Sequence, residues 1–180
     1  LRAPRWEGGA LLGAAVRGEG RFQLGVMTTS PWDDDFEIRI ASEATDALDL
    51  AVREFDALGH GIEGTALEPD VTYSPAFRAI WQAGAASIPA EGEAIALLEP
   101  LTQWLVARGR ELSGRELAEA LIALTLFERS IIRQFAKFDA VLTPTLAMTP
   151  RPIGWYDQTD AERSFTQQIQ YTPFTSFLNV

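Results

Sequence analysis

The chain has 180 residues, of which 47 % are hydrophobic and 22 % charged, a composition typical of one globular domain with a sizeable core. Its formal net charge of −10 repels phosphate backbones and disfavours recognition of nucleic acid through a basic face. The sequence contains no cysteine, which excludes disulfides, thiolate zinc sites and a cysteine nucleophile. We therefore expect one domain over residues 1–180, without a nucleic-acid partner.

Membrane spans and export signals both require long or characteristically placed apolar runs. The apolar runs fall far short of the roughly 20 residues that cross a bilayer. The first residues carry Arg2 and Arg5 without the apolar core of a signal peptide. We expect a cytoplasmic protein with no membrane partner.

The first half of the chain predicts a strand–helix–strand unit. Residues 22–27 are apolar and bounded by turn residues, which favours a short buried strand. Ser42 is a suitable N-cap for a helix that ends at Gly59, and residues 62–67 form the second expected strand. Such units cross over right-handedly, so we expect the two strands to be parallel.

An acidic run, Asp33, Asp34 and Asp35, follows Pro31-Trp32. It is compatible with a solvated turn or with a metal site. Consecutive carboxylates point in different directions and lack the spaced geometry of a calcium loop. The pattern favours the solvated turn.

The middle of the chain predicts helices. Ser74-Pro75 marks one start, and residues 95–106 form an amphipathic stretch in which Pro100 occupies the first turn or causes a kink. Ser113 followed by Glu116 is a capping box that opens the longest helix. Glu128 lies within the apolar stripe of this helix, either buried and paired with an arginine or, as we favour, at the rim.

The last third adds a strand and a polar helix. Residues 140–143 predict the third strand, and a proline-rich loop leads to a polar helix around residues 160–170. Residues 171–180 are apolar and aromatic. The expected fold class is α/β, with a partly parallel sheet holding strands 22–27, 62–67 and 140–143 between flanking helices.

Few side chains in the sequence can act as a general base. His60 is the single histidine and Lys137 the single lysine. His60 follows Gly59, as a turn residue does. Lys137 lies at the end of a predicted helix, where the helix dipole favours a surface cation. For both residues we favour these structural roles over an acid–base role.

Three segments together resemble the amidase-signature family. The first joins Arg-Phe-Gln-Leu-Gly-Val-Met (21–27) to a helix ending Glu-Phe-Asp-Ala-Leu-Gly-His-Gly (54–61). The second is Phe-Asp-Ala-Val-Leu-Thr-Pro-Thr (138–145), and the third is Tyr-Thr-Pro-Phe-Thr-Ser-Phe-Leu-Asn-Val (171–180). Their order and spacing agree with the family over nearly the whole chain. The resemblance implies hydrolysis of a carboxylic amide to an acid and ammonia or an amine, through a serine acyl-enzyme.

The family's Ser–cis-Ser–Lys triad has no counterpart in this sequence. In the family these residues lie upstream of the first segment, and this chain has no run such as Gly-Gly-Ser-Ser-Gly-Gly. We therefore assign no catalytic residue, metal or cofactor. The resemblance implies a C-terminal portion of an amidase, which in the family continues beyond Val180. The expected partners are the remainder of its own amidase chain and a small amide substrate.

Four residues are candidates for substrate binding. Thr143 and Thr145 follow a strand's carboxyl end, where open α/β sheets bind ligands. The resemblance implies that the loops carrying these threonines and residues 171–179 lie beside the acyl pocket. Phe174 is a candidate for its apolar lining and Asn179 for orienting a carbonyl or a loop.

Two other functions remain open. One is a non-catalytic α/β module that binds a metabolite or partner, and the other is an amidotransferase subunit, because the family includes such subunits. If the chain is part of an amidase, an apolar patch at residues 142–145 and 174–180 should be exposed or covered by self-association, with the terminal segment poorly ordered. A self-contained module should bury Phe174, Phe177 and Leu178.

Overall fold

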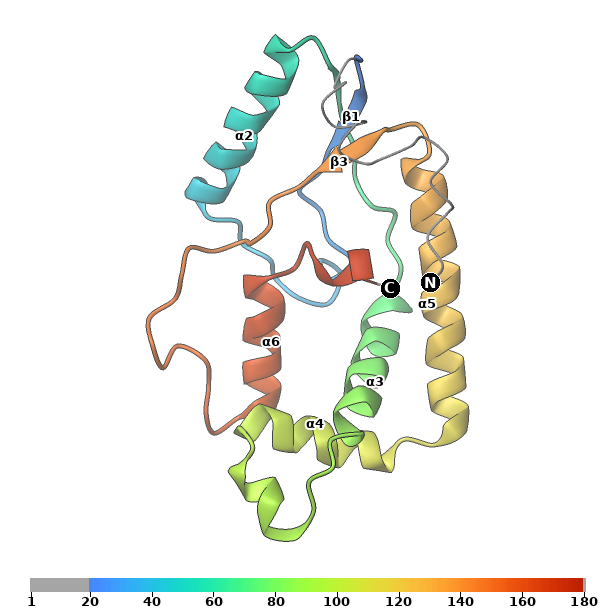
Figure 1. The fold of residues 1–180 in the computed structure, drawn as a ribbon, viewed down its shortest axis with the longest axis vertical. Coiled ribbons are helices and arrows are strands. Elements are labelled where there is room, and N and C mark those ends of the chain that lie inside the picture. The colour runs from blue at the N-terminus through green and yellow to red at the C-terminus, as the bar shows by residue number, and fades with distance from the viewer. Residues whose placement is uncertain (1–19, 180) are drawn as a thin grey trace, which may run out of the picture.

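The computed structural model describes residues 20–179, and within them three parallel strands form one sheet (Figure 1). The strands are β1 (Gln23–Val26), β2 (Gly61–Gly64) and β3 (Ala140–Leu142), in the order β2-β1-β3. Leu24 lies opposite Ile62 on one side and Ala140 on the other. The predicted parallel sheet is confirmed, although each strand is shorter than expected: residues 22, 27, 65–67 and 143 lie outside the strands.

Helix α2 (Ser42–Ala57) connects β1 to β2 and buries Leu48. The prediction of Ser42 as N-cap is wrong by one residue, because Ala41 holds that position without a side-chain cap. The amide of Ala41 donates to the carbonyl of Ala147 at 2.7 Å, and this long-range contact fixes where the helix begins. The predicted end is confirmed: Gly59 has φ +84°, a conformation that favours glycine.

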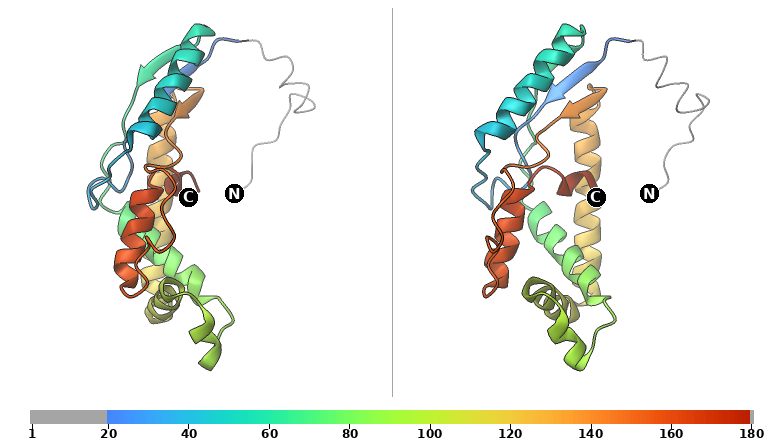
Figure 2. Two further views of the ribbon diagram at one scale, coloured as in Figure 1. Left: turned by 90° about the vertical axis from the view of Figure 1, so that its left-hand side faces the viewer. Right: turned by 60° about the vertical axis from the view of Figure 1, so that its left-hand side comes forward.

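The helices that follow are α3 (Tyr73–Ala86), α4 (Pro100–Glu111) and α5 (Gly114–Phe135), with a 3₁₀ helix, η1 (Gly92–Leu97), before α4. Pro100 occupies the first turn of α4, as expected, but residues 95–97 belong to η1. The capping box is confirmed, since Glu116 N donates to Ser113 Oγ at 3.2 Å and Ser113 N to Glu116 Oε2 at 2.8 Å. Figure 2 shows α2 beside the sheet and α3, α4 and α6 beyond the strands' carboxyl ends.

The core lies where the sheet meets these helices. Tyr73 is its centre, with its ring centroid 4.5 Å from that of Phe127 and 5.0 Å from that of Trp32. Aromatic pairs at such distances add to the gain from apolar burial. Buried side chains of the cluster come from the loop after β1 and from α3, α4, α5 and the C-terminal helices: Met27, Trp32, Tyr73, Phe77, Leu105, Leu124, Phe127, Phe165, Ile169 and Phe177.

The end of the chain corrects one expectation. Residues 176–179 form a 3₁₀ helix, η2 (Ser176–Asn179), rather than a poorly ordered segment. Phe174 and Phe177 are 0 % and 3 % exposed, so neither contributes to the expected patch, whereas Leu178 is 59 % exposed. Val180 lies outside the described residues. Exposed large apolar side chains instead gather on α5, namely Leu121, Ile122, Leu126 and Ile132.

Helix α6 (Ala161–Tyr171) confirms the predicted polar helix, and Asp160 caps it by accepting from Arg163 N at 3.0 Å. The turn before it is organised by Asp157. One carboxylate oxygen of Asp157 accepts from the amides of Thr159 and Asp160 at 2.8 and 2.9 Å and from the Thr159 hydroxyl at 2.9 Å. These bonds lower the pKa of Asp157 from 3.8 to about 2, because they favour the ionised form.

Replacing Asp157 with asparagine should flatten the acid dependence of stability. A carboxyl group whose pKa is lower in the folded state stabilises the fold above its unfolded pKa of 3.8 and loses this effect as the pH falls towards about 2. Asp157→Asn should therefore be less stable than the parent at pH 5 and approach it near pH 2, as measured by urea unfolding. Asp34→Asn changes an exposed carboxylate and is the matched control. An unchanged pH slope would contradict the prediction.

Candidate functional site

Three segments meet at the carboxyl ends of the parallel strands: residues 27–36, 143–149 and 172–179. Met27 N donates to the carbonyl of Leu142 at 2.9 Å, so the first two segments leave the sheet together. Ala147 N donates to the carbonyl of Tyr171 at 3.0 Å, which joins the second segment to the third. In Figure 1 they converge between the sheet and helices α3 and α6. This is the edge at which open α/β sheets bind ligands.

Trp32, Tyr73 and Ser176 form a hydrogen-bonded group at this edge, which we call the carboxyl-edge node. Trp32 Nε1 donates to Ser176 Oγ at 2.8 Å, and the Tyr73 hydroxyl donates to the same oxygen at 2.9 Å. Trp32 is 1 % exposed and Tyr73 0 % exposed. Burial raises the pKa of Tyr73 well above its ordinary value of 10.0, while the bond to Ser176 opposes this shift, so the phenol stays neutral.

The node is not predicted from the sequence. Ser176 is 144 residues from Trp32 and 103 from Tyr73, so no spacing pattern connects them. The available signal was chemical: a buried tryptophan or tyrosine requires a hydrogen-bond partner, and short polar residues in aromatic segments supply one. Tyr73 uses its hydroxyl hydrogen in the bond to Ser176, and Ser176 accepts both bonds of the node. The hydroxyl hydrogen of Ser176 is therefore not used by either bond within the node.

Thr143 and Thr145 line one cavity of about 410 Å³ between the start of α2 and the segment after β3. Thr143 Oγ1 is buried and has no hydrogen-bond partner within the described residues. Thr145 is exposed. The other lining residues are mostly apolar and include Ala47, Leu48, Ala51, Leu142, Leu146 and Met148.

The other two candidate residues lie apart from this cavity and are not among its lining residues. Phe174 is fully buried, and Asn179 Nδ2 donates to the carbonyl of Thr175 at 2.9 Å, which closes the turn of η2. The geometry thus brings Thr143 and Thr145 together, whereas Phe174 and Asn179 hold the neighbouring terminal segment.

His60 and Lys137 lie towards the amino ends of the strands, because they precede β2 and β3. His60 Nδ1 accepts from Phe22 N at 3.1 Å, and its ring stacks on Phe22. Lys137 forms an ion pair with Glu63. Neither side chain is hydrogen-bonded to the node in residues 20–179. Both side chains therefore hold local structure at the edge opposite the node.

The acidic run forms a turn rather than a cluster aimed at one point. Ser30 N and Oγ donate to the two carboxylate oxygens of Asp33 at 3.0 and 2.6 Å, while Asp34 and Asp35 are exposed. Within residues 20–179 no group of three histidine, aspartate or glutamate side chains is arranged to hold a metal ion. None of the described helices is both long and apolar enough to span a membrane.

The geometry defines an α/β protein with a parallel sheet whose carboxyl edge is surrounded by loops and helices. No family model and no curated protein matches the sequence. Solved structures do match the fold. The structure of 6-aminohexanoate cyclic dimer hydrolase has a TM-score of 0.73 at 20 % identity, over 89 % of this chain and 36 % of that one.

Two further solved structures share the fold. A bacterial aryl acylamidase belonging to the amidase signature enzymes family has a TM-score of 0.58 at 18 % identity, over 89 % of this chain and 37 % of its own. An amidase has a TM-score of 0.61 at 16 % identity, over 88 % and 37 % of the two chains. The fold is therefore part of the amidase-signature fold, and the chain spans little more than a third of these relatives' length.

Proposed function

We propose that this chain is the C-terminal portion of an amidase that hydrolyses a carboxylic amide through a serine acyl-enzyme. The observation that carries the proposal is the fold match to three amide hydrolases over nearly the whole of this chain. It agrees with the resemblance of segments 21–27 and 54–61, 138–145 and 171–180 to the amidase-signature family. In this proposal the Ser–cis-Ser–Lys triad belongs to the remainder of the amidase, and this portion supplies scaffold and pocket loops.

The faces of the sheet are only partly buried, which supports the proposal that this chain is part of a larger protein. Parallel sheets are usually buried on both faces, yet no residue of β2 or β3 is fully buried. Helix α5 also presents a face with Leu121, Ile122 and Leu126 at 52 %, 60 % and 58 % exposure. Such apolar surface is favourable to cover. The remainder of the amidase is the partner that we infer for it, with self-association as the alternative.

We propose pocket roles for four residues at or near the carboxyl edge. Thr143 and Thr145 are proposed to line the wall of the substrate site, because they share a cavity beside this edge. Phe174 and Asn179 are proposed to act through the position of η2, which the buried ring and the bond to Thr175 O maintain. The substrate is a small amide, and the proposed protein is cytoplasmic and uses no cofactor.

One observation favours the alternative of a non-catalytic binding module. Phe174 and Phe177 are buried within the chain itself, as a self-contained domain requires. The exposed Leu178 and the exposed face of α5 argue against such a domain. We therefore retain the amidase portion as the better supported function.

An activity measurement tests the proposal. The protein alone should hydrolyse p-nitroacetanilide and p-nitrophenyl acetate no faster than buffer, because it encodes no nucleophile–base pair. Co-expression with the polypeptide encoded upstream should give amide hydrolysis that is lost when the triad lysine of that polypeptide becomes alanine. Turnover by the isolated chain that disappears in Ser176→Ala but persists in Ser42→Ala would contradict the assignment. So would an upstream sequence without a triad.

A further inference from the structure

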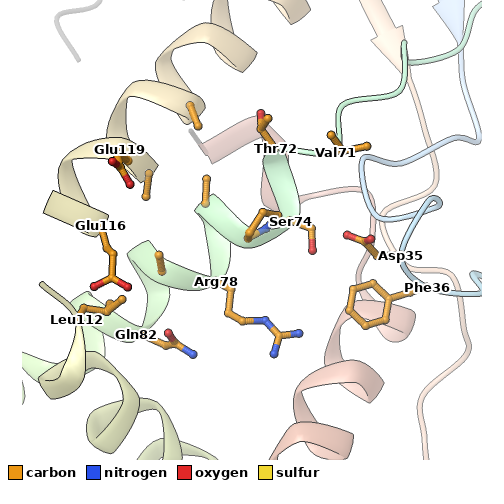
Figure 3. A pocket seen from close by; sticks show the side chains of 15 residues that line it. Asp35, Phe36, Val71, Thr72, Ser74, Arg78, Gln82, Leu112, Glu116 and Glu119 are labelled. Carbon is orange, nitrogen blue, oxygen red and sulfur yellow. The ribbon is translucent and has the colours of Figure 1, made fainter.

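A groove between α3 and α5 has a volume of about 870 Å³ (Figure 3). We call it the α3–α5 groove. Several of its lining side chains are small, including Ala76, Ala79, Ala120 and Ala123. Alanines in the lining let a backbone approach more closely than larger side chains would allow. The volume lies within the range of about 300–1,000 Å³ that is usual for ligand sites.

Polar side chains form a row along the α3 wall of this groove. Ser74, Arg78 and Gln82 are spaced four residues apart and line the same groove, as Figure 3 shows. Four residues of α-helix advance about 6 Å, so these groups repeat at that interval. An extended polypeptide advances about 3.3 Å per residue, so its amide groups on one side repeat every ~6.6 Å. The two repeats nearly match.

Ser74 and Gln82 are 6 % and 8 % exposed, and within residues 20–179 neither side chain forms a hydrogen bond. Their polar atoms are not fully enclosed, since Thr143 Oγ1 is the enclosed side-chain atom without a partner in these residues. Both groups can therefore bond to water or to a ligand. The exposed remnant of each side chain opens onto the groove that it lines. A ligand with its own donors and acceptors would satisfy both groups.

Arg78 is held in place between them. Its guanidinium forms an ion pair with Glu162 and lies over the ring of Phe165 at 4.8 Å from the centroid. An arginine has five N–H donors, so these contacts leave others for a carbonyl oxygen in the groove. The α3 wall therefore offers a hydroxyl, a guanidinium and an amide in sequence.

The charges that line the groove favour a basic ligand. Among the described residues, its lining carries the carboxylates of Asp35, Glu116 and Glu119 and the cation of Arg78. Arg78 is paired with Glu162 and Glu119 with Arg115, so carboxylates still exceed cations around the groove. The pKa of Glu116 is lowered, chiefly by its bonds to the side chain and backbone of Ser113, so this group stays ionised. A bound lysine or arginine side chain would meet an excess of negative charge.

We propose that the α3–α5 groove binds an extended peptide carrying a basic side chain, through its backbone amides. A docked helix fits less well, since its backbone groups are bonded internally and would leave Ser74 and Gln82 unpaired. This inference goes beyond the proposed amidase function, because binding requires no hydrolysis and no residue of the carboxyl edge.

Peptide binding is tested on the whole protein with Ac-Ala-Lys-Ala-Ala-NH₂. The lysine peptide should shift backbone NMR signals of α3 and the first half of α5. The same peptide with Glu in place of Lys should bind at least about fivefold more weakly. An N-methylated lysine peptide should lose binding, because its amides cannot donate. Equal binding of the N-methylated peptide, or shifts elsewhere in the protein, would overturn the proposal.

Two substitutions test the row itself. Ser74→Ala and Gln82→Leu should each raise the Kd of the lysine peptide about fivefold, the effect of one typical hydrogen bond. Ser42→Ala and Gln158→Leu make the same chemical changes at exposed positions outside the groove and should leave the Kd unchanged. Thermal unfolding of each variant shows whether it is folded. If a groove variant does not fold, the peptide-induced NMR shifts of the unaltered protein still test where the peptide binds. Unchanged affinity in both groove variants would contradict the assignment.

Discussion

Replacing Gly109 with alanine is expected to destabilise the protein by about 3 kcal/mol or more. An added Cβ would lie 1.9 Å from the carbonyl oxygen of Gln82 and 2.5 Å from its carbon, so α4 would have to move away from α3. The obstacle is helix backbone rather than the end of a flexible side chain. The effect is opposite in sign to that of the same change at an unobstructed helical glycine, which usually stabilises by about 0.5–1 kcal/mol.

Gly84→Ala is the matched control, because it lies in α3 and an added Cβ would meet nothing within 4 Å. It should raise the free energy of unfolding by about 0.5–1 kcal/mol. Urea unfolding of both variants, with an unchanged m-value, measures the difference. If Gly109→Ala proves as stable as Gly84→Ala, the close packing of α3 on α4 is not as described.

Ser176→Ala is expected to destabilise the protein by about 2–4 kcal/mol, because it leaves two buried donors unpaired. Trp32 Nε1 and the Tyr73 hydroxyl both donate to Ser176 Oγ, and both rings are almost fully buried. Ser176→Thr retains the hydroxyl and should recover most of the loss. Ser87→Ala removes an exposed hydroxyl that caps the end of α3, and it should cost less than Ser176→Ala.

A double-mutant cycle separates the two bonds to Ser176. Tyr73→Phe alone should cost about 1 kcal/mol, since Ser176 keeps its bond from Trp32. In the Ser176→Ala background the same change removes a hydroxyl that no longer has a partner, so it should be neutral or stabilising. Equal costs in the two backgrounds would show that Tyr73 and Ser176 are not coupled.

Patterns among residues close together in the sequence predicted the positions of most helices and strands. Gly59 supplied the positive φ that ends α2, and Ser113 with Glu116 formed the predicted capping box. The apolar segments 22–27, 62–67 and 140–143 each overlap one of the three parallel strands, as the crossover rule requires. The start of α2 was missed by one residue because Ala41 is held by Ala147, more than a hundred residues along the chain.

The candidate site was predictable only in part. Thr143 and Thr145 follow β3 directly, so the rule for strand ends placed them beside a cavity. Phe174 and Phe177 are aromatic residues, but residue type alone does not determine whether a ring lines a pocket or packs in the core. In the structure they are buried, and the exposed apolar face lies on α5 instead.

By itself the sequence determined the α/β class, the parallel crossover and the helix capping, because these depend on periodicity and on residues within a few positions of each other. Only the tertiary structure decided that Ser176 joins Trp32 and Tyr73, that Gly109 faces the backbone of Gln82, and that Ser74 and Gln82 face one groove. These contacts connect segments that are distant in the chain. They depend on how helices pack over one another, and packing geometry leaves no periodic pattern in the sequence.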